Sequence, residues 1–308
     1  LNMTRLALNL SEYVNGVAKR HAETSQRLFP GYQVRAITNG VHPHTWTSDP
    51  FCALYDRHMV GWAHEPELLR RAPHLPDDEV RAAHHRAKAA LIRRVADHCG
   101  VDLDPELPIL GFARRMTAYK RPDLLFTDLD RLRAIAAEQP FQLVLAGKAH
   151  PHDAPGKALI RQIHDHAREL ADVLPIAFLP NYDMDTALAL VSGVDVWLNT
   201  PLRPLEASGT SGMKAAFNGV PSLSVLDGWW LEGWIEGVTG WSVGDGPDGP
   251  NGHDADSLYH KLAEAVLPLY YDDPAGWTTL MKSCIGLNAS SFNTYRMMRR
   301  YATEAYLS

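Results

Sequence analysis

Between residues 108 and 226, short apolar runs alternate with segments of helical periodicity, and this alternation constrains the fold more than any other feature. The apolar runs cover 108–113, 141–146, 176–179, 194–198 and 222–226. Helical patterns separate them over 123–138, 157–170, 185–191 and 211–218. Strands that are apolar throughout are typical of a parallel sheet covered by helices on both faces. The sequence therefore predicts an α/β fold with a doubly wound, Rossmann-like sheet, whose ligands bind beyond the carboxyl ends of the strands.

The flanking regions are predicted to be mainly helical. We expect a helix over 6–29, a short strand over 34–38, and a long helix over 77–99 with Asp77 as its N-cap. Residues 244–256 are rich in Gly, Pro and Asp and are predicted to form a flexible surface loop. The remainder should be helical. Trp229 and Trp230 are expected in the core rather than in a substrate cleft, because apolar aromatics are usually buried.

Composition limits the classes of function. The chain has 308 residues and a net charge of -6, which argues against nucleic-acid binding because a phosphate backbone needs a basic face. Its three cysteines form neither a disulfide framework nor a zinc pattern, and they suit a reducing compartment such as the cytoplasm. No apolar run approaches the roughly 20 residues of a membrane span. Because the first residue is Leu1, we expect the chain to be a piece of a longer protein.

One candidate site is the segment Glu206-Ala-Ser-Gly-Thr-Ser-Gly-Met-Lys214, between a predicted strand and a predicted helix. Small residues let backbone N–H groups approach a ligand, and the start of a helix attracts phosphate. Lys214 has apolar neighbours, and burial would lower its pKa and favour the neutral amine that attacks a carbonyl. The residues alone leave open a solvated helix lysine beside a packing loop.

A second candidate is the basic segment Arg114, Arg115, Lys120 and Arg121, directly after a buried strand. Such a cluster can gather phosphate groups, although a solvated helix start remains the alternative. Loops containing Lys148, Asn181-Tyr182 and Asp227-Gly228 also follow strands and meet at the same edge. That convergence favours an active site over unrelated turns. The histidine pairs 42/44, 150/152 and 164/166 are not expected to bind a metal, because no carboxylate or cysteine set accompanies them.

These segments resemble a known family, and the resemblance covers nearly the whole chain. The motif from Glu206 to Lys214 is very similar to the pyridoxal-phosphate motif of the α-glucan (glycogen, starch and maltodextrin) phosphorylases, and Arg114-Arg115-x3-Tyr119-Lys120-Arg121 resembles their phosphate-binding segment. Arg114 stands where lysine is common, and Asp183 stands where the animal enzymes have arginine. These departures suggest the compact bacterial or archaeal branch and put allosteric regulation of the animal type in doubt.

The resemblance implies a role for each site residue. Lys214 would carry pyridoxal 5'-phosphate covalently. The cofactor contacts that it implies are Arg114, Tyr182, Thr210 and Ser211. Arg115 and Lys120 match residues that hold the substrate phosphate. Glu206, with the amides of Ser208 and Gly209, matches groups that bind the terminal glucose hydroxyls. Lys214, Arg115 and Lys120 are thus the expected catalytic set.

The resemblance also implies an architecture and a reaction. The chain would be the C-terminal half of a two-domain GT-B-type glycosyltransferase, with 1–47 as the tail of the N-terminal domain and 48–308 as the cofactor domain. The enzyme would be a hexosyltransferase that releases glucose 1-phosphate from an α-1,4-glucan with inorganic phosphate. Homo-oligomer formation is compatible with it, and neither nucleic acid nor a membrane is an expected partner.

Two other functions remain open at this point. One is a cofactor-free nucleotide-sugar glycosyltransferase of the same architecture, against which Lys214 argues. The other is a non-catalytic, truncated module that binds the cofactor but turns nothing over. Because the loops that would cover glucose from the other domain are missing, we expect the chain by itself to be inactive.

Overall fold

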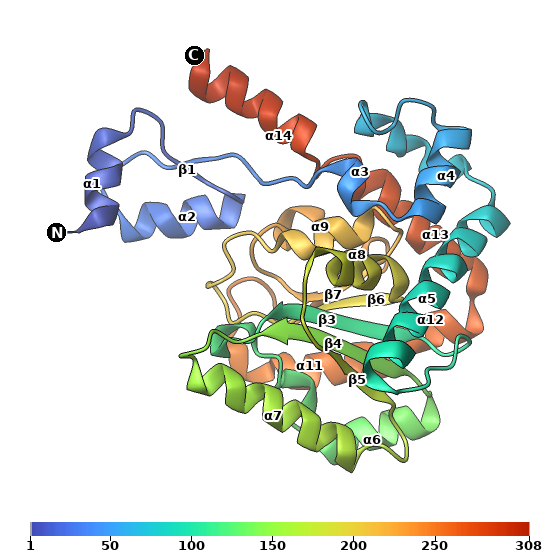
Figure 1. The fold of residues 1–308 in the computed structure, drawn as a ribbon. Coiled ribbons are helices and arrows are strands. Elements are labelled where there is room, and N and C mark those ends of the chain that lie inside the picture. Colours follow the sequence, from blue (N-terminus) through green and yellow to red (C-terminus); the bar gives the residue numbers. More distant parts are fainter. Residues whose placement is uncertain (1, 308) are drawn as a thin grey trace.

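The computed structural model describes residues 2–307, and its main body is a parallel sheet between helices (Figure 1). Within these residues, six strands form the main sheet in the order β5-β4-β3-β6-β7-β8, and every neighbouring pair is parallel. The strands are β3 (Ile109–Arg115), β4 (Gln142–Lys148), β5 (Ile176–Leu179), β6 (Val196–Asn199), β7 (Ser222–Val225) and β8 (Gly240–Val243). The predicted parallel α/β sheet is confirmed, and β8 adds an edge strand that the sequence pattern did not indicate.

Successive side chains of β3 point to opposite faces of the sheet and enter two separate apolar clusters. Leu110 and Phe112 belong to one cluster, whereas Ile109 and Ala113 belong to the other. The first cluster is covered by α6 (Leu129–Glu138), α7 (Ala154–Glu169) and α11 (Asp254–Lys261). The second is covered by α5 (Asp77–Cys99) and α8 (Met184–Gly193). Strands this apolar therefore occupy the middle layer of three.

Helix α5 spans the predicted residues, but its cap differs from the prediction. Pro76 is the N-cap residue, and Asp77 is the first residue of the helix. The Asp77 carboxylate pairs instead with Lys282 on α13 (Pro274–Ser283), so it does not turn back to cap its own helix. The helix ends at Cys99, and its C-cap residue Gly100 adopts a left-handed conformation with φ 64°.

The predicted helix over 6–29 is wrong. The structure has α1 (Met3–Leu10), then β1 (Asn15–Gly16), then α2 (Lys19–Leu28). Strand β1 pairs in parallel with β2 (Arg35–Ala36), so these residues form a small sheet of their own. A Cβ at Gly16 would lie 2.5 Å from the backbone nitrogen of Ala22, and this close approach of the chain interrupts the helical pattern.

Short and irregular helices complete the fold, and several continue the C-terminal helices as single π-helical turns. The remaining α-helices are α3 (Pro43–Trp46), α4 (Asp49–His58), α9 (Thr210–Ala216), α10 (Trp230–Gly233), α12 (Leu267–Asp272) and α14 (Thr294–Tyr301). The 3-10 helices are Pro66–His74, Ala118–Lys120, Leu124–Phe126 and Asn251–His253. The π-helical turns are Leu262–Val266, Cys284–Ala289 and Ala302–Tyr306.

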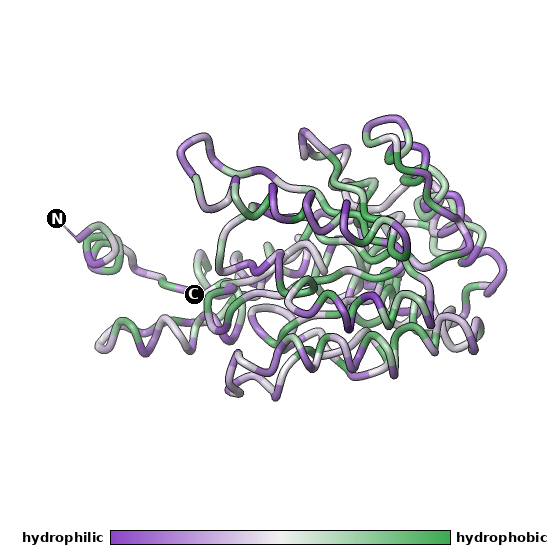
Figure 2. Tube along the Cα trace, turned by 90° about the horizontal axis from the view of Figure 1, so that it is seen from below, coloured by the Kyte–Doolittle hydropathy of each residue, from purple (hydrophilic) through white to green (hydrophobic). Residues whose placement is uncertain are grey.

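Hydrophobic residues are most frequent in the middle of the main body (Figure 2). Helices α1 and α14 lie at one side of the molecule (Figure 1). Trp229 and Trp230 are 2% and 1% exposed and belong to the first apolar cluster, so the expectation that they are core residues is confirmed. The α1–β2 region contacts the C-terminal segment, where the Asn15 amide donates to the Tyr301 hydroxyl at 2.9 Å. None of the helices in the described part of the chain combines the length and the apolar character that crossing a membrane requires.

Candidate active site

A cavity of about 380 Å³ opens at the carboxyl edge of the sheet. It brings together residues from the end of β3, from the 3-10 helix after it, and from the loop between β6 and α9 (Thr210–Ala216). The predicted site residues that line it are Arg114, Arg115, Lys120, Glu206, Ser208, Gly209, Thr210 and Ser211. The two segments singled out from the sequence thus form one pocket.

Glu206 lies between two of the predicted phosphate-binding cations. Its Oε2 is 2.7 Å from Arg114 Nη1 and 2.5 Å from Lys120 Nζ, and all three side chains are more than nine-tenths buried. The Arg115 side chain, by contrast, is exposed at the mouth of the cavity. The three cations outnumber the single carboxylate of Glu206, so the lining of the cavity has a net positive charge. Because buried charge is costly unless it is paired, the cavity is suited to an anion.

Two polar residues at strand ends hold this cluster in place. Asn199, the last residue of β6, accepts a hydrogen bond from the Arg114 guanidinium and donates to Ser224 Oγ at 2.9 Å. Asp227, just after β7, accepts from the backbone N–H of Glu206 at 2.9 Å, and burial raises the pKa of its carboxyl. Asp227 lies in a loop that sequence reasoning had marked, whereas Asn199 was missed. The sequence signal that could have indicated Asn199 is a polar residue at the end of an otherwise apolar strand.

The turn before α9 is tight and leaves one hydroxyl unpaired. Gly209 has φ 81°, a left-handed conformation that a side chain would strain. A Cβ at Gly228 would lie 2.5 Å from the carbonyl oxygen of Ser208, so only glycine fits this crossing. The Ser208 hydroxyl is buried, and no group in the described structure hydrogen-bonds to it. It is therefore a polar atom that a ligand in the cavity can satisfy.

Lys214 lies on α9 behind the cavity rather than in its lining. Its side chain is half-buried, and Nζ is 3.4 Å from the ring centroid of Trp46 in α3. Burial lowers the pKa of the Lys214 ammonium to about 8. The expected burial of this lysine is thus present in the structure. The contact with Trp46 was not predicted, because the two residues are far apart in the sequence.

Tyr182 also lies next to the cavity but outside its lining. It follows β5 and packs against the second apolar cluster. Burial raises the pKa of its hydroxyl, and the nearby Arg114 charge opposes that effect. Asn181 before it has φ 54°, which places the ring at the edge of the sheet by a left-handed turn. Across residues 2–307, no group of three or more His, Cys, Asp or Glu side chains is placed to hold a metal ion.

The fold and the site together define an α/β protein with a positively charged pocket at the carboxyl edge of a parallel sheet. Residues 1–235 match the family model described as carbohydrate phosphorylase. The chain therefore belongs to the carbohydrate phosphorylase family.

Named relatives agree with this assignment. The chain is 40% identical to a glycogen phosphorylase of Aquifex aeolicus and 39% identical to a maltodextrin phosphorylase of Thermococcus litoralis. It is 36% identical to a glycogen phosphorylase of Mycobacterium tuberculosis. Each match covers 99% of this chain but only 40% to 49% of the relative, so the chain spans less than half of the length of these proteins.

Proposed function

We propose that this chain is the cofactor-carrying half of an α-glucan phosphorylase, a hexosyltransferase that releases glucose 1-phosphate from an α-1,4-glucan with inorganic phosphate. The observation that carries the proposal is the buried cluster of Arg114 and Lys120 around Glu206, with positive charge left over at the start of α9. The names of the relatives support the same reaction. The alternation of helices over both faces of the sheet supports a doubly wound, Rossmann-like domain of a GT-B-type enzyme.

We further propose a division of the chain at about residue 47. Residues 1–47 would be the tail of the preceding domain, because β1 and β2 form their own small sheet apart from the main one. Residues 48–308 would be the cofactor domain. In a complete enzyme, the glucan would lie between this domain and an N-terminal one. Free Cys52, Cys99 and Cys284 support a cytoplasmic location, since unpaired thiols suit a reducing compartment.

The residues around Lys214 fit pyridoxal phosphate. A half-buried amine with a pKa of about 8 can act as a nucleophile near neutral pH, and the unpaired Ser208 hydroxyl and the tight turn at Gly209 leave polar groups for a phosphate. Lys214 would hold the cofactor covalently. Arg114, Tyr182, Thr210 and Ser211 would contact it. When bound, the cofactor would supply a phosphate group that exchanges protons with the substrate phosphate.

The residues of the chain would then hold that substrate phosphate and the sugar. Two phosphate dianions repel by about 4 kcal/mol for each pair of unit charges 4 Å apart at an effective dielectric constant of 20. Arg115 and Lys120 would offset this repulsion and stabilise the charge that develops as the glycosidic bond breaks. Glu206 and the amides of Ser208 and Gly209 would bind the hydroxyls of the terminal glucose.

One observation favours a second candidate, a module that binds the cofactor without catalysis. The chain spans less than half of the length of its relatives, so residues that their reaction requires can lie outside it. A cofactor-free nucleotide-sugar transferase is less consistent with the site, because it gives Lys214 no role. An assay of glucose 1-phosphate release by the longer parent protein separates the phosphorylase from the non-catalytic module, and cofactor content separates both from the cofactor-free transferase.

The direct test is to locate the cofactor. The purified chain is incubated with pyridoxal phosphate, reduced with borohydride and digested, and the pyridoxyl group is mapped by mass spectrometry. We expect the label on Lys214 and its loss in Lys214→Arg. Labelling elsewhere, or none in a folded sample, would contradict the proposed function.

A further inference from the structure

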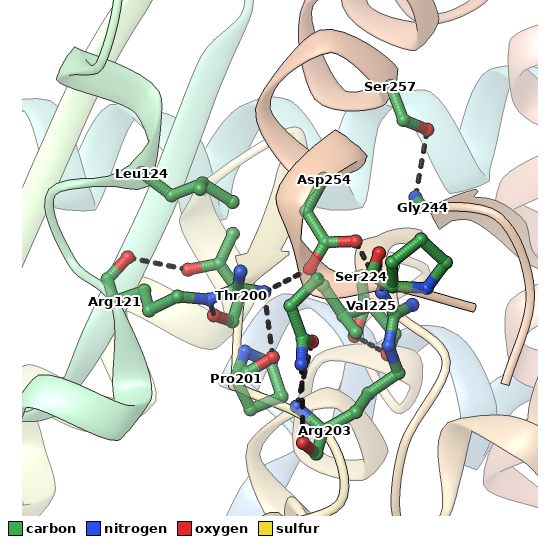
Figure 3. A network of polar contacts seen from close by, with 12 residues as sticks. Arg121, Leu124, Thr200, Pro201, Arg203, Ser224, Val225, Gly244, Asp254 and Ser257 are labelled. Atoms are coloured by element: carbon green, nitrogen blue, oxygen red, sulfur yellow. Dashed lines mark hydrogen bonds and ion pairs between the residues drawn. The ribbon is translucent and has the colours of Figure 1, made fainter. Parts of the chain in front are cut away.

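Asp254, at the start of α11, is fully buried and binds two arginines at once (Figure 3). Its Oδ2 is 2.5 Å from Arg121 Nη2, and its Oδ1 is 2.6 Å from Arg203 Nη2. Asp254 lies outside the lining of the cavity. Its helix nevertheless reaches both segments that build the cavity, because Arg121 follows Lys120 and Arg203 precedes Glu206 by three residues.

Arg121 connects the basic segment 114–121 to the loop after β6 through hydrogen bonds. Its Nε donates to the carbonyl of Thr200 and its Nη2 to the carbonyl of Pro201, both at 2.9 Å. In return, the Thr200 hydroxyl lies within hydrogen-bond distance of the carbonyls of Lys120 and Arg121, at 3.1 and 2.9 Å. Arg121 has φ 46°, which is unfavourable for a residue with a side chain and persists only where neighbouring contacts hold it.

Arg203 performs the same task for the loop that leads to Glu206. It donates to the carbonyls of Gly246 and Pro250, at 3.0 and 3.2 Å, so the 244–256 segment is anchored to the site. The surface loop predicted over 244–256 is present at 244–250, whereas 251–253 form a 3-10 helix and α11 begins at Asp254. Its flexibility stays a prediction, and the buried guanidinium takes two of its carbonyls as partners. The backbone N–H of Leu202 also donates to the carbonyl of Tyr119 at 2.7 Å.

We propose that Asp254 is a positioning residue for the phosphate site. Through Arg121 and Arg203, it sets where Lys120 lies relative to Glu206. A carboxylate that gives one oxygen to each of two rigid guanidinium groups fixes the distance between them. The buried charges of Asp254, Arg121 and Arg203 cost more free energy than apolar side chains of the same volume would. The alignment of Lys120 with Glu206 therefore explains these charges better than a contribution to stability does. This inference rests on the proposed function, because it assumes that Lys120 binds phosphate.

The test compares Asp254→Asn with Asp256→Asn in the chain loaded with pyridoxal phosphate and reduced with borohydride. Asp256 lies two residues further along α11, where its side chain is 78% exposed and pairs with Arg131 at 2.8 Å. This control removes the same charge from the same helix without touching Arg121 or Arg203. Two quantities are measured: the extent of pyridoxyl labelling at Lys214, and the Kd of inorganic phosphate by calorimetric titration.

We expect Asp254→Asn to weaken phosphate binding about tenfold, the factor that one weakened charge-assisted hydrogen bond produces, while labelling of Lys214 stays as in the unmodified chain. Asp256→Asn should change neither quantity. A purely structural role would instead lower folding stability and labelling together. Equal phosphate affinity in both variants, or no phosphate binding by the unmodified loaded chain, would overturn the inference.

A milder variant covers the case in which Asp254→Asn fails to fold. Thr200→Val keeps the volume of the side chain but removes the hydroxyl bonded to Lys120 and Arg121, and it should weaken phosphate binding in the same direction. Unchanged affinity in a folded Thr200→Val chain would also overturn the inference. Failure of the proposed function is distinguishable, because it would appear as absent labelling of Lys214 in the unmodified chain.

Discussion

The reactivity of Lys214 should follow a pKa of about 8, because desolvation of its ammonium group favours the neutral amine. The ordinary value for lysine is 10.5. At pH 7, about 9% of the Lys214 amine would be neutral, compared with about 0.03% for an ordinary lysine, a difference of about 300-fold. Only the neutral form of the amine reacts with a carbonyl group, so this fraction sets the reactivity of Lys214.

The assay is competitive acetylation by trace acetic anhydride between pH 6 and 9.5, quantified at Lys214 by peptide mass spectrometry. A small amine of known pKa is added as the internal standard, and circular dichroism verifies that the chain stays folded at each pH. The labelling rate should rise about 50-fold from pH 6 to pH 8 and only about twofold from pH 8 to pH 9.5.

The upper pH range decides the outcome. A lysine with the ordinary pKa would gain about 30-fold in labelling rate between pH 8 and pH 9.5. A rise of that size at Lys214 in the folded chain would refute the reasoning from burial. It would also remove one support for Lys214 as the cofactor lysine.

Four further predictions concern the pocket and the cleft. Glu206→Gln should tighten binding of inorganic phosphate severalfold, because it removes the carboxylate that pairs with Arg114 and Lys120. Unchanged affinity, measured by titration, would show that this carboxylate does not compete with phosphate for the two cations. In an enzyme completed with its N-terminal half, Arg115→Ala should raise the KM for phosphate far more than that for glucan, since a lost charged hydrogen bond costs about 1.5–3 kcal/mol; values within twofold of the unmodified enzyme would exclude the role. Gly228→Ala should lower the free energy of unfolding by about 1–3 kcal/mol in denaturant titrations, whereas Gly252→Ala, where nothing lies within 4 Å, serves as the control. Finally, the chain alone should release no glucose 1-phosphate from maltoheptaose while the longer parent does, at equal cofactor occupancy; comparable rates would contradict the two-domain cleft.

Much of the main domain could be predicted from the sequence. The apolar runs gave β3 to β7 and their parallel arrangement, because residues buried on both faces must be apolar along their whole length. Helix α5 was placed at its observed bounds by its apolar periodicity. The two site segments were placed together because the carboxyl ends of parallel strands meet at one edge. Local burial patterns were sufficient for these features.

Features without a local pattern were missed or wrong. Strand β1 has only two residues, which is too short for any periodicity, and the helix predicted across it was therefore wrong. The strand predicted over 34–38, by contrast, contains β2. The expected N-cap at Asp77 failed because its carboxylate pairs with Lys282, which lies far along the chain. The contact of Lys214 with Trp46 depends likewise on which segments the fold brings together.

The sequence by itself determined the fold class, the family resemblance and the edge of the sheet at which the chemistry would lie. Only the tertiary structure placed Glu206 between Arg114 and Lys120 and joined Asp254 to Arg121, 133 residues away. The physical reason is that periodicity records whether a residue is buried but not what it is buried against. Partners of buried charges are set by the strand order and by the packing of distant loops, and these exist only in the folded chain.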